Sequence, residues 1–292
     1  MFNEGVLLGF ATAFFWGVSP LLYRWGGEGL SPIETNFIRN VGAFISVLFV
    51  NFLLETWDQV RVLLPLEGWV IFFSSLILGL FVGDNMFFKG LEKIGVGKCT
   101  VISSSYPIVT IITAHLFFGE KITAKLILAC LAVISGIYLL YEEKDATSPR
   151  KLPLSNYILP LGTAISWGLS LALVKAVSSY FTPVSFMTWR VGSLLLITSF
   201  SILLKRTKLS RNIKKVRTWL ILSFGGTLGI GVSYLAFIKA LHLAPVSQIG
   251  VITATSPLIT TLLASLFYKE KLGFKESMGS IFVVAGSILA SV

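Results

Sequence analysis

Ten apolar segments run through this sequence, and each is long enough to cross a lipid bilayer as a helix. About 20 apolar residues in a helix span the hydrocarbon core of roughly 30 Å. The bilayer interior offers no water to backbone groups, and the segments lack the alternating pattern of a barrel strand, so we expect helices. The predicted helices cover residues 6–25, 33–54, 70–90, 98–118, 123–141, 157–177, 184–204, 218–240, 247–268 and 274–291.

The composition places the chain in the same class. Hydrophobic residues make up 54% of the sequence and charged residues only 13%, whereas about a quarter of the residues of a soluble domain are charged. The formal net charge of +10 would suit a nucleic-acid-binding protein, but the cations lie in short loops and form no basic domain with interleaved aromatic residues. We therefore expect an all-α polytopic membrane protein whose partner is the lipid bilayer, and no nucleic acid.

The second half of the chain repeats the first half. AFFWGVSPLLYR (13–24) recurs as AISWGLSLALVK (164–175), and PIVTIITAHLFFGEK (107–121) recurs as PLITTLLASLFYKEK (257–271), with seven of fifteen positions identical. A shift of one residue relates the two offsets, so a single five-helix unit has been duplicated. The predicted repeats are residues 1–145 and 157–292, joined by a linker at 146–156.

Because each unit contains an odd number of helices, the second unit enters the membrane from the opposite side. The ten helices then form two inverted five-helix repeats, which is an architecture of secondary transporters. Such carriers bind a small-molecule substrate near the membrane midplane, at the interface of the repeats, and expose it to each side in turn. A monomer or a homodimer is compatible with this arrangement.

Two long segments carry a resemblance to a known family. KGLEKIGVGKCTVISSSYPIVTIITAHLFFGEKI (89–122) and KALHLAPVSQIGVITATSPLITTLLASLFYKEKL (239–272), with the Trp-Gly pair early in each repeat, resemble the EamA-type family of the drug/metabolite transporter superfamily. The resemblance covers essentially the full chain. It implies a ten-helix inverted-repeat carrier, often an exporter of amino acids or other small metabolites, in the plasma (inner) membrane of a prokaryote. It does not name the substrate, because the superfamily also handles drugs, nucleotide sugars and sugar phosphates.

One acidic residue, Asp84, lies inside the third apolar segment. A carboxylate in the membrane costs several kcal/mol unless it is paired, hydrated or protonated. Two interpretations remain open. Asp84 could bind a substrate amine or a coupling ion beside Asn85, or it could pair with a cation such as Lys89, Arg39 or Arg190.

Charge is distributed unequally between the repeats. Tyr234 occupies the position in the second half that Asp84 has in the first, and this asymmetry suits a cavity that binds one end of a zwitterion. Arg39 and Arg190 lie at matched positions within the second and seventh segments. They could extend to the lipid headgroups, or they could face the bundle as cations that lock gates or attract a carboxylate.

Aromatic and hydroxyl residues complete the predicted cavity. Trp16 and Trp167 lie well inside their segments, away from the interfacial positions of aromatic belts, which favours cavity lining or gating. His115 is either a proton switch or a packing residue. The predicted substrate-contacting residues are Trp16, Ser19, Asp84, Asn85, Ser104, Tyr106, Trp167, Ser170, Tyr234, Thr255 and Ser256.

Pro107 and Pro257 predict helix breaks at matched positions of the two repeats. Proline removes a backbone hydrogen bond, and paired breaks are a strong sequence indication of a transport site. The hydroxyl residues that precede each proline, SSSYP and TATSP, could satisfy the freed carbonyls or bind a ligand.

The sequence contains no motif of an enzyme or an ATP-driven pump. G-x-S-x-G, H-E-x-x-H and the Walker A loop are all missing, so a gradient or an exchange reaction must supply the energy. Cys99 and Cys130 lie in apolar segments without metal-ligand spacing, and no cofactor is expected.

Two functions are compatible with these features. The first is alternating-access export of amino acids or similar amphipathic solutes. The second is exchange of anionic solutes such as sugar phosphates or nucleotide sugars, for which Arg39, Arg190, Lys89 and Lys239 would supply charge. A channel would show rings of like charge or a carbonyl filter, and a structural bundle would have no need of an intramembrane carboxylate.

Lysine and arginine are distributed asymmetrically between the two sides of the membrane. The loops on the side of the termini hold five of these cations and the other side holds seventeen, with Arg39 and Arg190 left out as intramembrane. The positive-inside rule then places both termini outside the cytoplasm, whereas the family resemblance implies cytoplasmic termini.

We predict from the charge count that the C-terminus is extracytoplasmic. A fluorescent or protease-accessible reporter fused after Val292 tests this topology. Reporter signal confined to the cytoplasm would contradict it.

Overall fold

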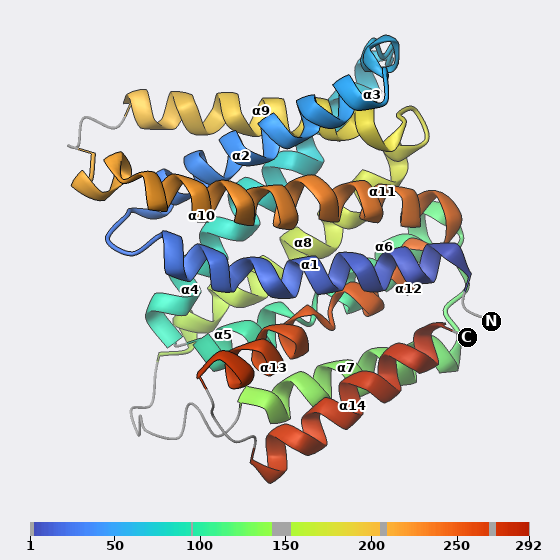
Figure 1. Cartoon of the computed structure of the whole chain (residues 1–292). Coiled ribbons are helices and arrows are strands. Elements are labelled where there is room, and N and C mark those ends of the chain that lie inside the picture. The colour runs from blue at the N-terminus through green and yellow to red at the C-terminus, as the bar shows by residue number, and fades with distance from the viewer. Residues whose placement is uncertain (1–2, 95, 142–152, 205–208, 269–272, 292) are drawn as a thin grey trace.

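The computed structural model of the chain describes residues 3–94, 96–141, 153–204, 209–268 and 273–291. All regular secondary structure in these residues is helical. Eight of the helices are long and apolar enough to cross a membrane, and a ninth, Ala124–Leu140, is apolar but shorter. Figure 1 shows the helices lying side by side in one bundle with both termini at the same end. With the 18-residue helix Phe274–Ser291 as the tenth, the predicted all-α polytopic membrane fold of ten helices is confirmed.

The first five spans match the prediction in order, with changes at their edges. The third predicted segment, 70–90, is part of a longer run that begins at Leu66 and ends at Ile94. The elements are α1 (Glu4–Gly26), α2 (Pro32–Leu53), the short η1 (Trp57–Val60), α3 (Leu66–Leu76), η2 (Ile77–Gly83), α4 (Asp84–Ile94), α5 (Val96–Ser103), α6 (Tyr106–Phe118) and α7 (Ala124–Tyr141).

The second half repeats this order. Most of the predicted linker at 146–156 falls outside the described residues, so the repeat boundaries remain a prediction. The elements are η4 (Leu154–Tyr157), α8 (Ile158–Ser178), α9 (Pro183–Leu204), η5 (Arg211–Lys214), α10 (Val216–Gly226), η6 (Thr227–Val232), α11 (Ser233–Leu243), α12 (Val246–Thr253), α13 (Ser256–Tyr268) and α14 (Phe274–Ser291).

Each half contains a stretch of π-helix at the same place in its third span, η2 in the first half and η6 in the second. Such wide turns within α-helices occur frequently at functional sites. A glycine in each stretch permits close packing. A Cβ atom at Gly79 would overlap the Ser170 hydroxyl, and one at Gly229 would overlap the Ser19 hydroxyl. The two π-helices therefore pack tightly against the first helix of the opposite half.

The predicted helix breaks are confirmed, but the prolines act differently from our expectation. Pro107 and Pro257 are each the second residue of a new helix, α6 or α13, where the missing N–H leaves no bond unmade. They begin a helix and do not kink a continuous one. The hydroxyls of Ser105 and Thr255 donate to the carbonyls of Ile102 and Ile252, at 2.6 and 2.7 Å respectively. These two hydroxyls satisfy backbone carbonyls at the break.

The first helix of each repeat packs among the helices of the other repeat, so the repeats exchange their first helices. Helix α1 packs against α10, α11, α12 and α13 of the second half, and α8 packs against α3, η2, α4, α5 and α6 of the first half. Figure 1 shows α1 beside the orange and red helices of the second half. The interface of the repeats therefore lies at the centre of the molecule.

Side chains of the two halves are joined at the end of the bundle that holds the termini. The Glu120 carboxylate accepts hydrogen bonds from the backbone N–H groups of Val246 at 2.9 Å and Ser247 at 3.1 Å, and from the Ser247 hydroxyl. It thereby caps the N-terminus of α12, where a negative charge is favourable. The Glu120 side chain therefore joins the two halves at this end of the bundle.

Glycines allow α7 and α14 to pack along their whole length. A Cβ atom at Gly136 would lie 2.6 Å from the carbonyl oxygen of Gly279, which is closer than real contacts permit. Small residues at helix interfaces are what association in lipid requires. By contrast, a Cβ atom at Gly192 would meet only Phe44, at 3.4 Å.

We predict that Gly136→Ala destabilises the fold by about 1–3 kcal/mol, because the added methyl forces the two backbones apart. The thermal midpoint of the detergent-purified protein measures this effect. Gly192→Ala is the matched control and should leave the midpoint unchanged or slightly raised. Equal midpoints for the two variants would contradict the α7–α14 packing.

Candidate functional site

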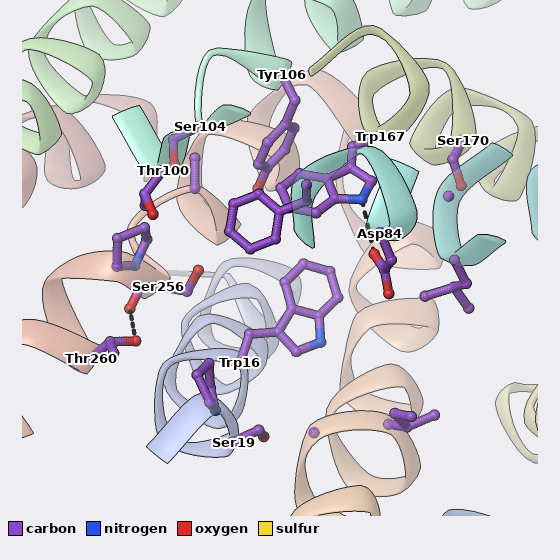
Figure 2. A pocket seen from close by; sticks show the side chains of 18 of the residues that line it. Trp16, Ser19, Asp84, Thr100, Ser104, Tyr106, Trp167, Ser170, Ser256 and Thr260 are labelled. Carbon is purple, nitrogen blue, oxygen red and sulfur yellow. Dashed lines mark hydrogen bonds between the residues drawn. The ribbon is translucent and has the colours of Figure 1, made fainter. Parts of the chain in front are cut away.

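A cavity of about 400 Å³ lies at the interface of the repeats. Its walls come from α1, α2, η2, α4, α5, α6, α8, η6, α11 and α13, so both repeats contribute to it. Figure 2 shows side chains from these elements pointing into a shared space. The volume lies within the range of small-molecule sites, roughly 300–1,000 Å³.

Most residues predicted from the sequence line this cavity. Both tryptophans are present, on opposite walls, and the matched serines of α1 and α8 are also present (Figure 2). The predicted residues found in the lining are Trp16, Ser19, Arg39, Asp84, Ser104, Tyr106, Trp167, Ser170, Tyr234, Ser256 and Pro257.

Six predicted residues lie outside the lining, and Arg190 is one of them. The Asn85 amide donates to the Phe81 carbonyl at 2.6 Å on an exposed face. The Thr255 hydroxyl donates to the Ile252 carbonyl at the helix break. Lys239 forms an exposed ion pair with Glu4, at 2.6 Å, and Lys89 is exposed. Neither lysine lines the cavity, and both are exposed. Pro107 is buried near the cavity without lining it.

Sequence reasoning missed about half of the wall. Tyr23 and Thr260 could have been found from their positions one helical turn beyond Ser19 and Ser256. The π-helical residues gave no recognisable signal, because their exposure to the cavity depends on a wide helical turn. The missed residues are Pro20, Tyr23, Gly79, Leu80, Phe87, Thr100, Leu171, Gly229, Ile230, Ala254 and Thr260.

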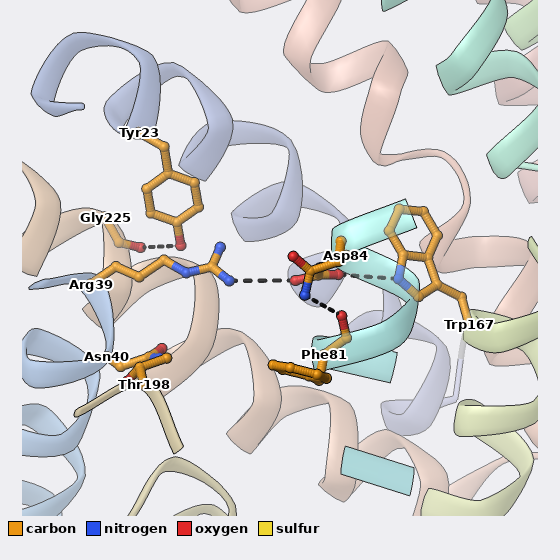
Figure 3. A network of polar contacts seen from close by, with 9 residues as sticks. Tyr23, Arg39, Asn40, Phe81, Asp84, Trp167, Thr198 and Gly225 are labelled. Carbon is orange, nitrogen blue, oxygen red and sulfur yellow. Dashed lines mark hydrogen bonds and ion pairs between the residues drawn. The ribbon is translucent and has the colours of Figure 1, made fainter. Parts of the chain in front are cut away.

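One corner of the cavity is ionic. Nη2 of Arg39 lies 3.4 Å from Oδ2 of Asp84, and the Trp167 indole N–H donates to Oδ1 of Asp84 at 3.1 Å (Figure 3). The side chains of Arg39 and Asp84 are 12% and 15% exposed. The Arg39 guanidinium also lies over the Tyr23 ring, 5.1 Å from its centroid. Asp84 therefore both pairs with a cation and faces the cavity.

The opposite corner is aromatic. The Arg190 guanidinium lies 5.2 Å from the centroid of the Tyr234 ring, and the Trp16 ring packs against Tyr234 at 5.5 Å. The Trp16 indole N–H donates to the Ser233 hydroxyl, at 3.1 Å. Arg190 is 1% exposed, so neither arginine extends to the headgroups, and that interpretation is wrong for both.

The two corners are copies of one arrangement. Arg39, Asp84 and Trp167 correspond, at the offset of the repeats, to Arg190, Tyr234 and Trp16. In each corner an arginine meets the residue at the start of the α-helix after the π-helix, and a tryptophan comes from the exchanged first helix. The duplicated scaffold carries a carboxylate on one side and a phenol ring on the other. Such a cavity can bind charged groups and an apolar body together.

No group of three His, Cys, Asp or Glu side chains that could hold a metal occurs among the described residues. Cys99 and Cys130 are buried free thiols, as predicted. Nδ1 of His115 lies 2.9 Å from the Glu120 carbonyl oxygen at the end of α6, outside the cavity. This position favours the structural interpretation of His115 over a proton switch.

Comparisons with known proteins agree with the fold. A family model described as the EamA-like transporter family matches residues 3–142 and 154–292. The chain is 25% identical over 286 residues to an "Uncharacterized transporter" of Archaeoglobus fulgidus, covering 97% of this chain and 96% of that protein. It is 23% identical over 304 residues to the "Uncharacterized inner membrane transporter YhbE" of Escherichia coli K12, covering 99% and 91%.

A solved structure titled "Crystal structure of protein" shares the fold. The TM-score is 0.84 at 14% sequence identity, and the match covers 100% of this chain and 97% of that chain. At this level of identity the likeness concerns the fold alone.

We predict that Arg39 and Asp84 are energetically coupled. In a double-mutant cycle of Arg39→Gln and Asp84→Asn, thermal unfolding should give a coupling of about 0.5–3 kcal/mol, because either single change leaves a poorly hydrated polar group without its partner.

The exposed pair of Glu4 and Lys239 is the matched control. It is shorter, at 2.6 Å, but its side chains are 61% and 53% exposed. Solvent screening should limit its coupling to at most about 1 kcal/mol. Equal coupling in the two cycles would contradict the proposed role of burial.

Proposed function

The chain belongs to the EamA-like transporter family, and we propose that it carries amino acids or similar zwitterionic, amphipathic solutes across the inner membrane by alternating access. The family makes it an integral membrane transporter. The substrate class, the direction of transport and the membrane are our proposals. A relative is named an inner membrane transporter, and the family resemblance favours export.

The observation that carries the substrate proposal is the ion pair in the cavity wall. Asp84 offers a carboxylate to a substrate ammonium group, and Arg39 offers a guanidinium to a substrate carboxylate. An amino acid carries both groups on one carbon atom. It can insert between the two side chains and replace one ion pair by two.

This exchange suits a carrier better than a tight binder. In the empty cavity the two protein charges satisfy each other, and in the loaded cavity the substrate satisfies them. The charges have partners in both the empty and the loaded cavity, so the free energy of binding is only the difference between the two sets of ion pairs. The substrate is therefore not held too strongly to leave. The nitrogen–oxygen separation of 3.4 Å is at the long end of the range for a hydrogen-bonded pair.

Aromatic rings supply a surface for the apolar part of the substrate. Trp16 and Tyr234 lie on one wall, and Phe87, Tyr106 and Trp167 form a connected group on the other, with ring centroids 5.1 and 6.1 Å from Trp167. Rings contribute large apolar areas and favour offset or edge contacts with other rings and alkyl chains. The site therefore suits amino acids with sizeable apolar side chains.

The alternative, exchange of phosphorylated solutes, has less support. A phosphate group would meet the Asp84 carboxylate in the same corner, and like charges at short range are unfavourable. Lys89 and Lys239, which we expected to help an anionic substrate, lie away from the cavity.

We predict that purified protein in liposomes exchanges radiolabelled apolar amino acids across the bilayer. Asp84→Asn should weaken transport by about 10- to 100-fold, since a hydrogen bond to a charged group contributes about 1.5–3 kcal/mol. Lys239→Gln is the control and should transport normally. Exchange of sugar phosphates that is lost in Arg39→Gln and kept in Asp84→Asn would establish the anion exchanger instead.

A further inference from the structure

Arg190 is a buried cation that the proposed function does not use. It lies near the middle of α9, is 1% exposed, and is the largest fully buried side chain described. Its Nη1 donates one hydrogen bond to the Ser75 hydroxyl, at 3.0 Å, and its guanidinium packs over the rings of Phe186 and Tyr234. Nε has no hydrogen-bond partner. Among the described residues, no carboxylate lies within ion-pair distance of Arg190.

Such a position is unfavourable for a group with only a structural role. Removal of a guanidinium from water is compensated only by good ionic and hydrogen-bond partners, and intramembrane charges commonly serve function. A neutral side chain of similar length could fill the same space and bond Ser75. The unpaired charge and the unbonded Nε of Arg190 indicate a partner that arrives during the working cycle, and its chemistry must be anionic.

Arg190 lies directly behind the cavity wall. Tyr234, against which it packs, lines the cavity, and so does Gly79. A Cβ atom at Gly79 would lie 3.8 Å from Nη2 of Arg190. A glycine backbone and one ring therefore separate the guanidinium from the substrate space. A small rearrangement of η2 or α11 would expose it.

The duplicated sequence gives Arg190 an equivalent residue in the first repeat. Arg39, the equivalent residue of the first repeat, lines the cavity and pairs with Asp84, whereas Arg190 is covered. Carriers of this build alternate access by moving one repeat against the other. Because the two repeats are copies in opposite orientations, we infer that the opposite-facing state is the one in which they exchange conformations. In that state the second-repeat arginine should line the cavity, and the first-repeat arginine should be covered.

We propose that Arg39 and Arg190 bind the anionic group of the substrate in turn, each in one of the two facing states. The inference rests on the proposed function in requiring a substrate with a carboxylate or another anionic group. Arg39 holds that group in the state of this structure, in which Glu120 joins the two halves at the terminus end. Arg190 receives it when the cavity opens at the terminus end. The carboxylate thus passes between two cations and is never left unpaired within the membrane.

Cysteine accessibility tests the exchange without any substrate. In a background with Cys99→Ala and Cys130→Ala, Arg39→Cys and Arg190→Cys are labelled with a membrane-impermeant cationic methanethiosulfonate in right-side-out and inside-out vesicles. Lys239→Cys, at an exposed position near the terminus end, reports the orientation. We expect Arg190→Cys to react from the same face as Lys239→Cys, and Arg39→Cys from the other face. Reaction of both from one face, or no reaction of Arg190→Cys, would overturn the proposal.

Transport kinetics provide the second measurement, on variants with polar replacements of the two arginines. Arg190→Gln should raise KM by about 10- to 100-fold for substrate added at the membrane face that holds the termini, because one charge-assisted hydrogen bond is lost. KM at the other face should change little. Arg190→Lys should restore part of this affinity, and Arg39→Gln should show the opposite sidedness. If Arg190 had only a structural role, Arg190→Gln would lower the thermal midpoint and raise KM equally at both faces. That result would refute the proposal that the two arginines bind the anionic group in turn. Labelling from opposite faces without amino-acid transport would instead reject the substrate class alone.

Discussion

The inability of a lipid bilayer to solvate charge governs this molecule. Three charged side chains, Asp84, Arg39 and Arg190, lie within the membrane-spanning helices and close to the repeat interface. Their positions are tolerated because Asp84 and Arg39 satisfy each other beside the Trp167 indole, and because aromatic faces and the Ser75 hydroxyl shield Arg190. The exchanged first helices place Trp16 and Trp167 beside these groups. The π-helices bring the backbone of each half close to the first helix of the other half.

The fold was largely predictable, because lipid imposes a simple rule. Every spanning segment must be a helix of a certain length, so hydropathy alone located all ten spans, and the duplicated sequence predicted two inverted halves. The matched prolines located the two helix breaks. The π-helices were not predictable, because a wide turn depends on how Gly79 and Gly229 pack against Ser170 and Ser19 of the opposite half, and such contacts leave no pattern within one segment.

The site was predicted in part for a related reason. Residues that are unusual inside a membrane, such as Asp84, Arg39 and the non-interfacial tryptophans, were identified by chemistry and line the cavity. Lys89 and Lys239 were chosen by the same chemistry but lie at exposed helix positions, where a cation costs little free energy. Thr255 was chosen as a ligand residue, yet its hydroxyl bonds the backbone. The hydrogen bonds of Glu120 were not predicted, because their partner, the N-terminus of α12, is distant in the sequence.

The central claim is that Asp84 and Arg39 bind the two charged groups of one amino acid. The most direct measurement is the thermal stabilisation of the detergent-purified protein by an apolar amino acid, by its methyl ester and by the matching acid without the amine, since a ligand of the folded state raises the melting temperature. The account predicts stabilisation by the amino acid and little by either analogue. Equal stabilisation by all three compounds would contradict it.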